Sequence, residues 1–119
     1  MKIQRFEDII AWQKAQELAV FIYKLFKNSR DFGFKDQITR AAVSISSNIA
    51  EGFERNTDAD FSRFLSIAKG SNSEVKSLLY LAKKLEYLNE NEVQEGLTFS
   101  NEIGKILNGL INSLKKISN

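Results

Sequence analysis

The sequence predicts an all-α protein, an antiparallel up-down-up-down four-helix bundle that forms a single domain over residues 1–119. Three observations support this prediction. The chain contains no proline and only six glycines, so little in it interrupts a helix. Apolar residues recur at intervals of three and four in four segments, which is the spacing of one helical face. Short polar stretches separate the segments, and short connections make neighbouring helices antiparallel.

The first two helices are expected from about Glu7 to Asn28 and from about Phe34 to Phe53. The break between them is polar and contains a glycine. Gly52 lies near the end of the second helix, where it predicts a left-handed cap or a tight exit of the chain. The apolar stripe of the first helix consists of Ala11, Ala15, Leu18, Ile22 and Leu25.

The third helix is expected to begin after Thr57 and to run to about Leu88. Thr57 and Asp60 have the spacing of a capping box. Gly70, with the polar residues after it, is the point where a bend is expected. Asn89 stands three residues before Glu92, which predicts the N-cap of a fourth helix that runs to about Lys116.

The apolar surface exceeds what one bundle core needs. The first helix carries a second apolar face, away from its main stripe, and the third helix is similarly broad. Such faces are covered by another subunit or by a wide internal contact, and half-exposed flanking residues are the alternative. We therefore predict a homo-oligomer. Its interface is assigned on the first helix to Ile9, Trp12, Val20 and Tyr23.

One local pattern predicts a nucleic-acid interface. The net charge is only +2, so a polyanion site has to rest on a local patch. One row of the third helix combines lysines, which neutralise phosphates, with tyrosines, which stack on bases. A solvated lysine face is the alternative. The residues of this row are Lys69, Ser73, Lys76, Tyr80, Lys83 and Tyr87.

The residue types exclude most catalytic sites. The chain has no cysteine and no histidine, so zinc sites, thiol nucleophiles and Glu-x-x-His di-iron sites are ruled out. A magnesium-dependent nucleotide-processing enzyme is the remaining enzymatic alternative, through Glu51-x-x-Glu54 and Glu92-x-x-Glu95. Within one chain these pairs should lie at opposite ends of the bundle, so they could share a magnesium ion only at a site formed between two subunits. We expect no enzymatic activity, no metal and no cofactor.

The sequence also suggests where the protein is found. Its first residues lack the apolar core of a signal peptide. No run of about 18 apolar residues predicts a transmembrane helix. We expect a cytoplasmic protein with no membrane partner.

Three stretches resemble one known family. They are F-E-D-I-I-A-W-Q-K-A (residues 6–15), Q-I-T-R-A-A-V-S-I-S-S-N-I-A-E-G (residues 37–52) and I-A-K-G-S-N-S-E (residues 67–74). Over almost its whole length the chain resembles the four-helix-bundle proteins associated with intervening sequences of bacterial 23S rRNA genes. Family members often have a proline in the first interhelical loop, and this chain has none.

The resemblance implies ring-shaped homopentamers. It also implies a relation to accessory proteins of diversity-generating retroelements, in which a basic ring is thought to engage nucleic acid and a reverse transcriptase. Arg40 and Glu51 lie in the most family-like stretch, three turns apart on one helical face. They are therefore added to the interface as a pair acting between subunits.

Two functional hypotheses follow. The first is an oligomeric helical module without catalytic activity that binds RNA, DNA or a nucleic-acid-processing enzyme. The second is a protein-interaction scaffold that does not contact nucleic acid.

Overall fold

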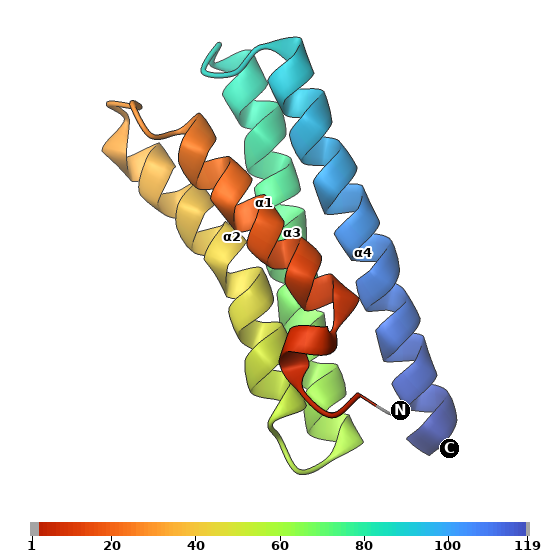
Figure 1. Cartoon of the computed structure of the whole chain (residues 1–119). Helices are drawn as coiled ribbons and strands as arrows, with labels where there is room; N and C mark the ends of the chain where they lie inside the picture. Colours follow the sequence, from red (N-terminus) through yellow and green to blue (C-terminus); the bar gives the residue numbers. More distant parts are fainter. Residues whose placement is uncertain (1–2, 119) are drawn as a thin grey trace.

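The structure, a computed structural model, describes residues 3–118, with side chains up to Lys116. A short 3-10 helix, η1 (Phe6–Asp8), precedes four α-helices: α1 (Ile10–Leu25), α2 (Phe32–Phe53), α3 (Asp58–Lys84) and α4 (Glu90–Ser118). Figure 1 shows the α1–α2 and α3–α4 loops at one end of the bundle and the α2–α3 loop at the other. The prediction of an all-α four-helix bundle is confirmed.

The four helices are arranged in a square. α1 packs against α2 and α4, and α3 packs against the same two helices, whereas the backbones of the diagonal pairs lie further apart within the part of the chain described. The molecule is 47 Å long and about 20 Å across. Each pair of neighbouring helices therefore forms one long outer face. We name these faces by their helices, so that the α1–α4 face is opposite the α2–α3 face.

The core follows the predicted apolar stripes along the whole bundle, and Ala11, Ala15, Leu18 and Ile22 of α1 are fully buried. Ile9 belongs to this core as well, with 1% of its surface exposed. Its assignment to an oligomer interface was wrong. The helix begins only at Ile10, and Ile9 before it has extended backbone angles (φ −76°, ψ 119°), which remove it from the helical periodicity.

Two predicted helix starts are confirmed. The Thr57 hydroxyl accepts a hydrogen bond from the Asp60 amide at 3.1 Å. Asn89 and Glu92 form a reciprocal capping box, in which each side chain accepts from the other's amide at 2.8 and 2.9 Å. These caps satisfy amides that have no partner inside their helices.

Gly52 does not form the predicted cap. It is buried inside α2, and no glycine in the described part of the chain has a positive φ. A Cβ atom added to Gly52 would lie 2.5 Å from the Phe64 Cβ atom of α3 and 3.1 Å from the Phe61 ring. Gly52 is therefore the point where α2 and α3 approach closely. The bend expected at Gly70 does not interrupt α3, which is helical from Asp58 to Lys84.

α3 ends earlier than predicted. Lys84 is its last residue, and Glu86 takes the left-handed conformation with φ 62°. The Tyr87 amide then donates to the Ala82 carbonyl and the Glu86 amide to the Lys83 carbonyl, which is a Schellman motif. Tyr87 therefore lies outside the helix, so its placement on the lysine row of α3 was wrong.

Tyr87 instead connects the two loops at its end of the bundle. Its hydroxyl donates to Asp31 Oδ2 at 2.6 Å, and its ring packs edge-on against Phe34. Asp31 Oδ1 accepts from the Phe34 amide and so caps α2. The hydrogen bond from Tyr87, followed by that from the Phe34 amide, lowers the pKa of Asp31 below its ordinary value of 3.8.

Tyr87→Phe should make stability less sensitive to acid. Because folding lowers the pKa of Asp31, the unfolded chain binds a proton first as the pH falls, and the stabilisation present above pH 3.8 is lost on acidification. Without the hydroxyl this loss is smaller. The free energy of unfolding in urea, measured from pH 7 to pH 3, should be lower for the variant at pH 7, and the difference from the wild type should narrow in acid. A gap that stays constant contradicts this, and Tyr23→Phe on α1 is the control.

Candidate nucleic-acid interface

The lysine row is only partly assembled in the structure. Lys69, Ser73 and Tyr80 are exposed on the outer side of α3, and Lys76 between them is half-buried. The four residues follow helical spacing within one uninterrupted helix. They form a continuous strip of cations and hydroxyl groups.

The other two predicted members are engaged elsewhere. The Lys83 ammonium is 2.5 Å from Glu90 Oε2 of α4, and this hydrogen bond lowers the pKa of Glu90. Lys83 therefore has much of its charge neutralised within the chain. Tyr87 lies beyond the helix and bonds to Asp31. The predicted six-residue interface reduces to Lys69, Ser73, Lys76 and Tyr80, which we call the α3 strip.

Two contacts show that the α3 strip borders α4. The Lys83–Glu90 ion pair joins the facing ends of the two helices. Further along, Asn72 and Ser100 form a buried pair, in which Asn72 Nδ2 donates to the Ser100 carbonyl at 2.9 Å and the Ser100 hydroxyl donates to Asn72 Oδ1 at 3.0 Å. The strip therefore belongs to the α3–α4 face.

Charge is distributed unevenly along the chain. Residues 61–85 contain five basic residues and one acidic residue, Glu74. Glu74 lines a groove shared with α2, where Gln37 bonds to it at 3.4 Å. Residues 103–119 contain three lysines and no acidic residue, and the rest of the chain has nine basic and fourteen acidic residues. The small net charge thus conceals a positively charged α3 and second half of α4.

The groove on the α2–α3 face has a volume of about 450 Å³. Ser44 and Ser71 bridge its floor by a 2.9 Å hydrogen bond, and Arg40 lies on its α2 side. No carboxylate of residues 3–118 forms an ion pair with Arg40. Glu51 is paired with Arg55 of its own helix at 3.0 Å. Within one chain Arg40 and Glu51 remain apart, as their spacing predicted.

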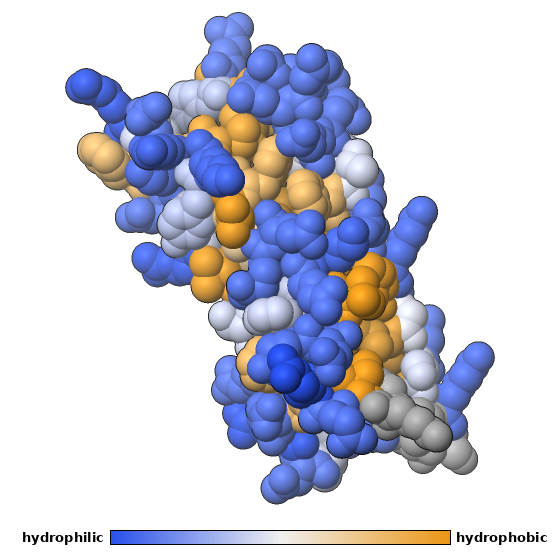
Figure 2. All heavy atoms as spheres, viewed as in Figure 1, coloured by the Kyte–Doolittle hydropathy of each residue, from blue (hydrophilic) through white to orange (hydrophobic). Residues whose placement is uncertain are grey.

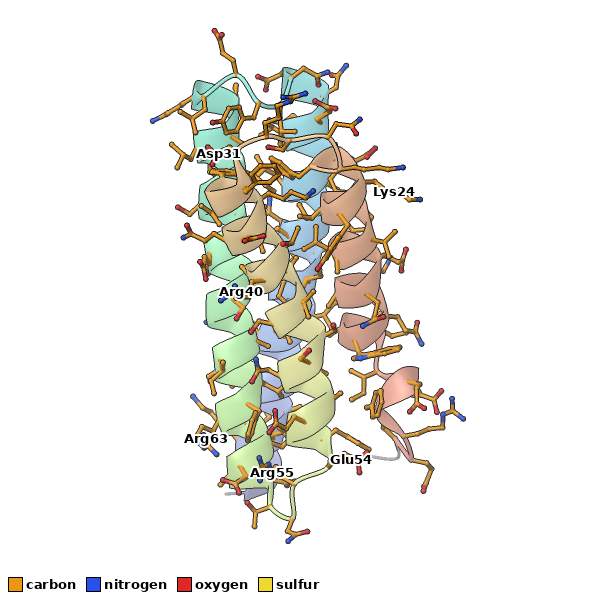
Figure 3. All side chains as sticks on the ribbon, turned by 90° about the vertical axis from the view of Figure 1, so that its left-hand side faces the viewer. Lys24, Asp31, Arg40, Glu54, Arg55 and Arg63 are labelled. Carbon is orange, nitrogen blue, oxygen red and sulfur yellow. The ribbon has the colours of Figure 1, made fainter. Side chains whose placement is uncertain are left out.

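Two arginines that the sequence offers as additions to the nucleic-acid surface, without a common location, meet at the α2–α3 loop. The guanidinium groups of Arg55 and Arg63 each lie 4.7 Å from the centre of the Phe64 ring, which is within cation–π distance. Figure 3 shows both near this end of the bundle, with Arg40 further up the same side. Their eight-residue separation spans a loop, so helical periodicity could not bring them together.

The α1–α4 face contains the more apolar groove, of about 590 Å³. Val20, Phe21 and Phe99 line it, and Glu17 and Glu95 are at its rim. Figure 2 shows apolar side chains in the channel between α1 and α4. The other α1 residues assigned to an interface differ in exposure. Val20 and Tyr23 are each 52% exposed, whereas Trp12 is half-buried and packs edge-on against Phe6.

The two glutamate pairs considered for magnesium are far apart. Glu51 and Glu54 are at the C-terminal end of α2, and Glu92 and Glu95 are in the first turns of α4. Figure 1 shows that these points lie at opposite ends of the bundle. Residues 3–118 contain no group of three or more acidic side chains placed to hold one metal ion. None of the described helices is long and apolar enough to span a bilayer.

Comparison with known proteins identifies a family and a similar solved structure. A family model described as "23S rRNA-intervening sequence protein" matches residues 7–109. The chain is similar to a crystal structure from Bacteroides thetaiotaomicron, described as a protein with unknown function from the S23 ribosomal protein family. The two are 31% identical with a TM-score of 0.81, over 86% of this chain and 98% of the other. No curated protein matches the chain.

Proposed function

The chain belongs to the family of 23S rRNA-intervening sequence proteins, and within that family we propose that it is a nucleic-acid-binding helical module without a catalytic site of its own. One observation carries the proposal: residues 61–85 hold five basic residues against one acidic residue, and that carboxylate lies in the groove with α2. The α3 strip is therefore free of acidic residues over about four helical turns.

The chemistry of the strip suits a phosphate backbone. Lys69 and Lys76 each place one cation beside α4, seven residues apart and about 10.5 Å along the helix axis. Ser73 and Tyr80 add hydroxyl groups that donate to phosphate or sugar oxygens. Such contacts bind by charge and position without reading the base sequence, and their affinity falls steeply with salt.

Lys69→Gln/Lys76→Gln should weaken nucleic-acid binding about tenfold and reduce the salt dependence by about one unit of slope per lysine. Glutamine keeps most of the aliphatic stem of half-buried Lys76, so the fold should persist. Fluorescence anisotropy with labelled structured RNA and duplex DNA, at several salt concentrations, measures both quantities.

The matched control is Lys24→Gln/Lys27→Gln on α1 and its C-terminal turn, which removes the same charge from another part of the molecule. Equal losses in the two variants would mean that only net charge matters. Absence of binding to either probe at low salt, with a folded wild type, overturns the proposal and favours the protein-interaction scaffold.

A second function, self-association, is supported by two unlike exposed faces on opposite sides of the bundle. Ile67, Leu81 and Leu85 on α3 are 43%, 43% and 44% exposed. Ile67, Glu74 and Leu81 are spaced seven apart, and Glu74 lines the α2–α3 groove, so this apolar row flanks the α2–α3 face. On the opposite side is the apolar α1–α4 groove around Val20.

A second copy of this chain also offers partners for the charges in these faces. Arg40 lies with Asp36 and Glu74 in the α2–α3 groove and lacks an intrachain carboxylate partner in the described structure. Glu17, Glu95 and Lys24 line the α1–α4 groove, so each face presents charges of both signs to the other. Contact between unlike faces is head-to-tail, which produces a closed ring or a filament. The predicted pentamer is one such ring.

Val20→Glu and Ile67→Glu should each reduce the assembly to monomers, because each places a charge in one of the two faces. An equimolar mixture should form a dimer, since each variant keeps one intact face. Light scattering with size-exclusion chromatography measures the masses, with Asn101→Glu, at an exposed position of the α3–α4 face, as control. A monomeric wild type, or a mixture that stays monomeric, contradicts head-to-tail assembly.

A further inference from the structure

α4 presents a second polar row, which the sequence analysis did not single out. Its residues are exposed and spaced at intervals of four and three, as on one side of a helix. The row contains one cation, three amides, one hydroxyl and no carboxylate. The Gln94 amide donates to Glu90 and the Thr98 hydroxyl donates to the Gln94 carbonyl, and the other two amides have no hydrogen-bond partner in the described structure. Its members are Gln94, Thr98, Asn101, Lys105 and Asn108.

Each carboxylate of α4 has a contact of its own, and one of them, Glu90, also accepts a hydrogen bond from Gln94 of this row at 3.3 Å. Glu90 pairs with Lys83, and Glu92 accepts from the Asn89 amide in the capping box. Glu95 lies at the α1–α4 groove. Glu102 is 2.8 Å from Lys14 of α1, and this hydrogen bond raises the pKa of Lys14. The row itself therefore contains no carboxylate, and the charge of Glu90 beside its first residue is paired with Lys83, although α4 contains four glutamates.

The register between the helices places the two rows side by side. Lys83 faces Glu90, and Asn72 faces Ser100. In an antiparallel pair these two contacts place residues 69–83 of α3 level with about residues 90–103 of α4. The α3 strip is therefore level with about residues 92–103 of α4 and lies beside the first part of the α4 row, while Lys105 and Asn108 extend past Lys69. Together the two rows cover about 24 Å of the α3–α4 face.

We infer that the α3–α4 face as a whole binds the sugar-phosphate backbone of a double-stranded nucleic acid, an inference that rests on the proposed function and names its ligand. Lysines on both helices contact phosphates, and the amides and hydroxyls between them donate to phosphate and sugar oxygens. At a rise of 3.4 Å per base pair, about 24 Å of face covers about seven base pairs.

The face lacks the groups that single strands require. Proteins that bind single strands without sequence preference stack successive bases on several aromatic side chains. Tyr80 is the one aromatic side chain on these two rows, because the Tyr87 hydroxyl bonds to Asp31 and its ring packs against Phe34. Two rigid antiparallel helices that lie side by side and bear cations and amides favour the regular backbone of a duplex.

Fluorescence anisotropy with duplex RNA, duplex DNA and an unstructured single strand of the same length tests this inference. We expect either duplex to bind at least about fivefold more tightly than the single strand. Asn101→Ala/Lys105→Ala should weaken duplex binding about tenfold and lower the salt slope by about one unit, since one lysine is removed. Comparing the two duplexes shows whether the 2′-hydroxyl contributes.

The outcomes separate this inference from the proposed function. Binding that Lys69→Gln/Lys76→Gln weakens but Asn101→Ala/Lys105→Ala leaves intact overturns the inference and retains the α3 strip. Tighter binding of the single strand than of either duplex also overturns the inference and retains the α3 strip. No binding to any of the three probes overturns both. Asn91→Ala/Lys27→Ala, with the same residue types outside the two rows, is the control, and circular dichroism confirms that each variant is folded.

Discussion

Gly52→Ala should destabilise the protein by about 1–3 kcal/mol, although alanine is the better helix former. The added Cβ atom would lie 2.5 Å from the Cβ atom of Phe64. That atom is fixed to the backbone of α3, so a change of rotamer cannot relieve the clash. α2 and α3 would have to separate, and the contacts around Phe61 and Phe64 would loosen. The free energy of unfolding in urea measures the effect.

Gly70→Ala is the matched control. Gly70 is also inside a helix, but a Cβ atom there meets nothing within 4 Å. The same substitution should stabilise the protein by about 0.5–1 kcal/mol, because only the helix propensity of alanine acts. Opposite signs at the two glycines would show that close packing governs Gly52. A neutral or stabilising Gly52→Ala would mean that the two helices separate at little cost.

Helical periodicity predicted the helices because each has one apolar side, but it could not locate their ends. α1 begins at Ile10 because the backbone at Ile9 is extended. α3 ends at Lys84 because Glu86 adopts a positive φ. Glycine normally occupies this position of a helix end, and the sequence has no glycine there to mark it. The Thr57 and Asn89 caps were predicted correctly because their hydrogen bonds are local in sequence. Boundaries without such a local signal depend on tertiary contacts.

Spacing along one helix predicted part of the candidate site. It placed Lys69, Ser73, Lys76 and Tyr80 correctly, since all four lie within α3. It could not show that Glu90 would neutralise Lys83, because that contact depends on the register between α3 and α4. It also could not place the α4 row beside the α3 strip, because that position depends on the same register. Only packing shows that Glu90 beside the row pairs with Lys83 and that Glu95 and Glu102 lie on the side of α1.

The buried polar pair that sets this register leads to the second large effect. Asn72 is 6% exposed and Ser100 is 1% exposed. Each donates one hydrogen bond to the other residue, and no buried side-chain nitrogen or oxygen atom in the described structure lacks a partner. Because a shift of one residue would leave these groups unpaired in the core, the pair fixes how α3 and α4 align.

Asn72→Asp should destabilise the protein by about 3 kcal/mol or more at pH 7. The substitution keeps the shape of the side chain, but it buries a carboxylate and replaces the donor that contacts the Ser100 carbonyl at 2.9 Å. Two oxygen atoms would then face each other without a proton between them. Asn101→Asp, the same substitution at an exposed position of α4, should change stability by less than about 0.5 kcal/mol.

The destabilisation by Asn72→Asp should diminish in acid. Burial raises the pKa of the introduced carboxyl in the folded state, so the folded chain binds its proton at a higher pH than the unfolded chain. Stability relative to the wild type is therefore highest below the ordinary aspartate pKa of about 3.9 and is lost as the pH rises. In urea unfolding from pH 4 to pH 8, the difference in the free energy of unfolding between the wild type and the variant should grow as the pH rises. A gap independent of pH would mean that the helices had moved to let water reach the carboxylate, and that the pair does not hold α3 and α4 in register.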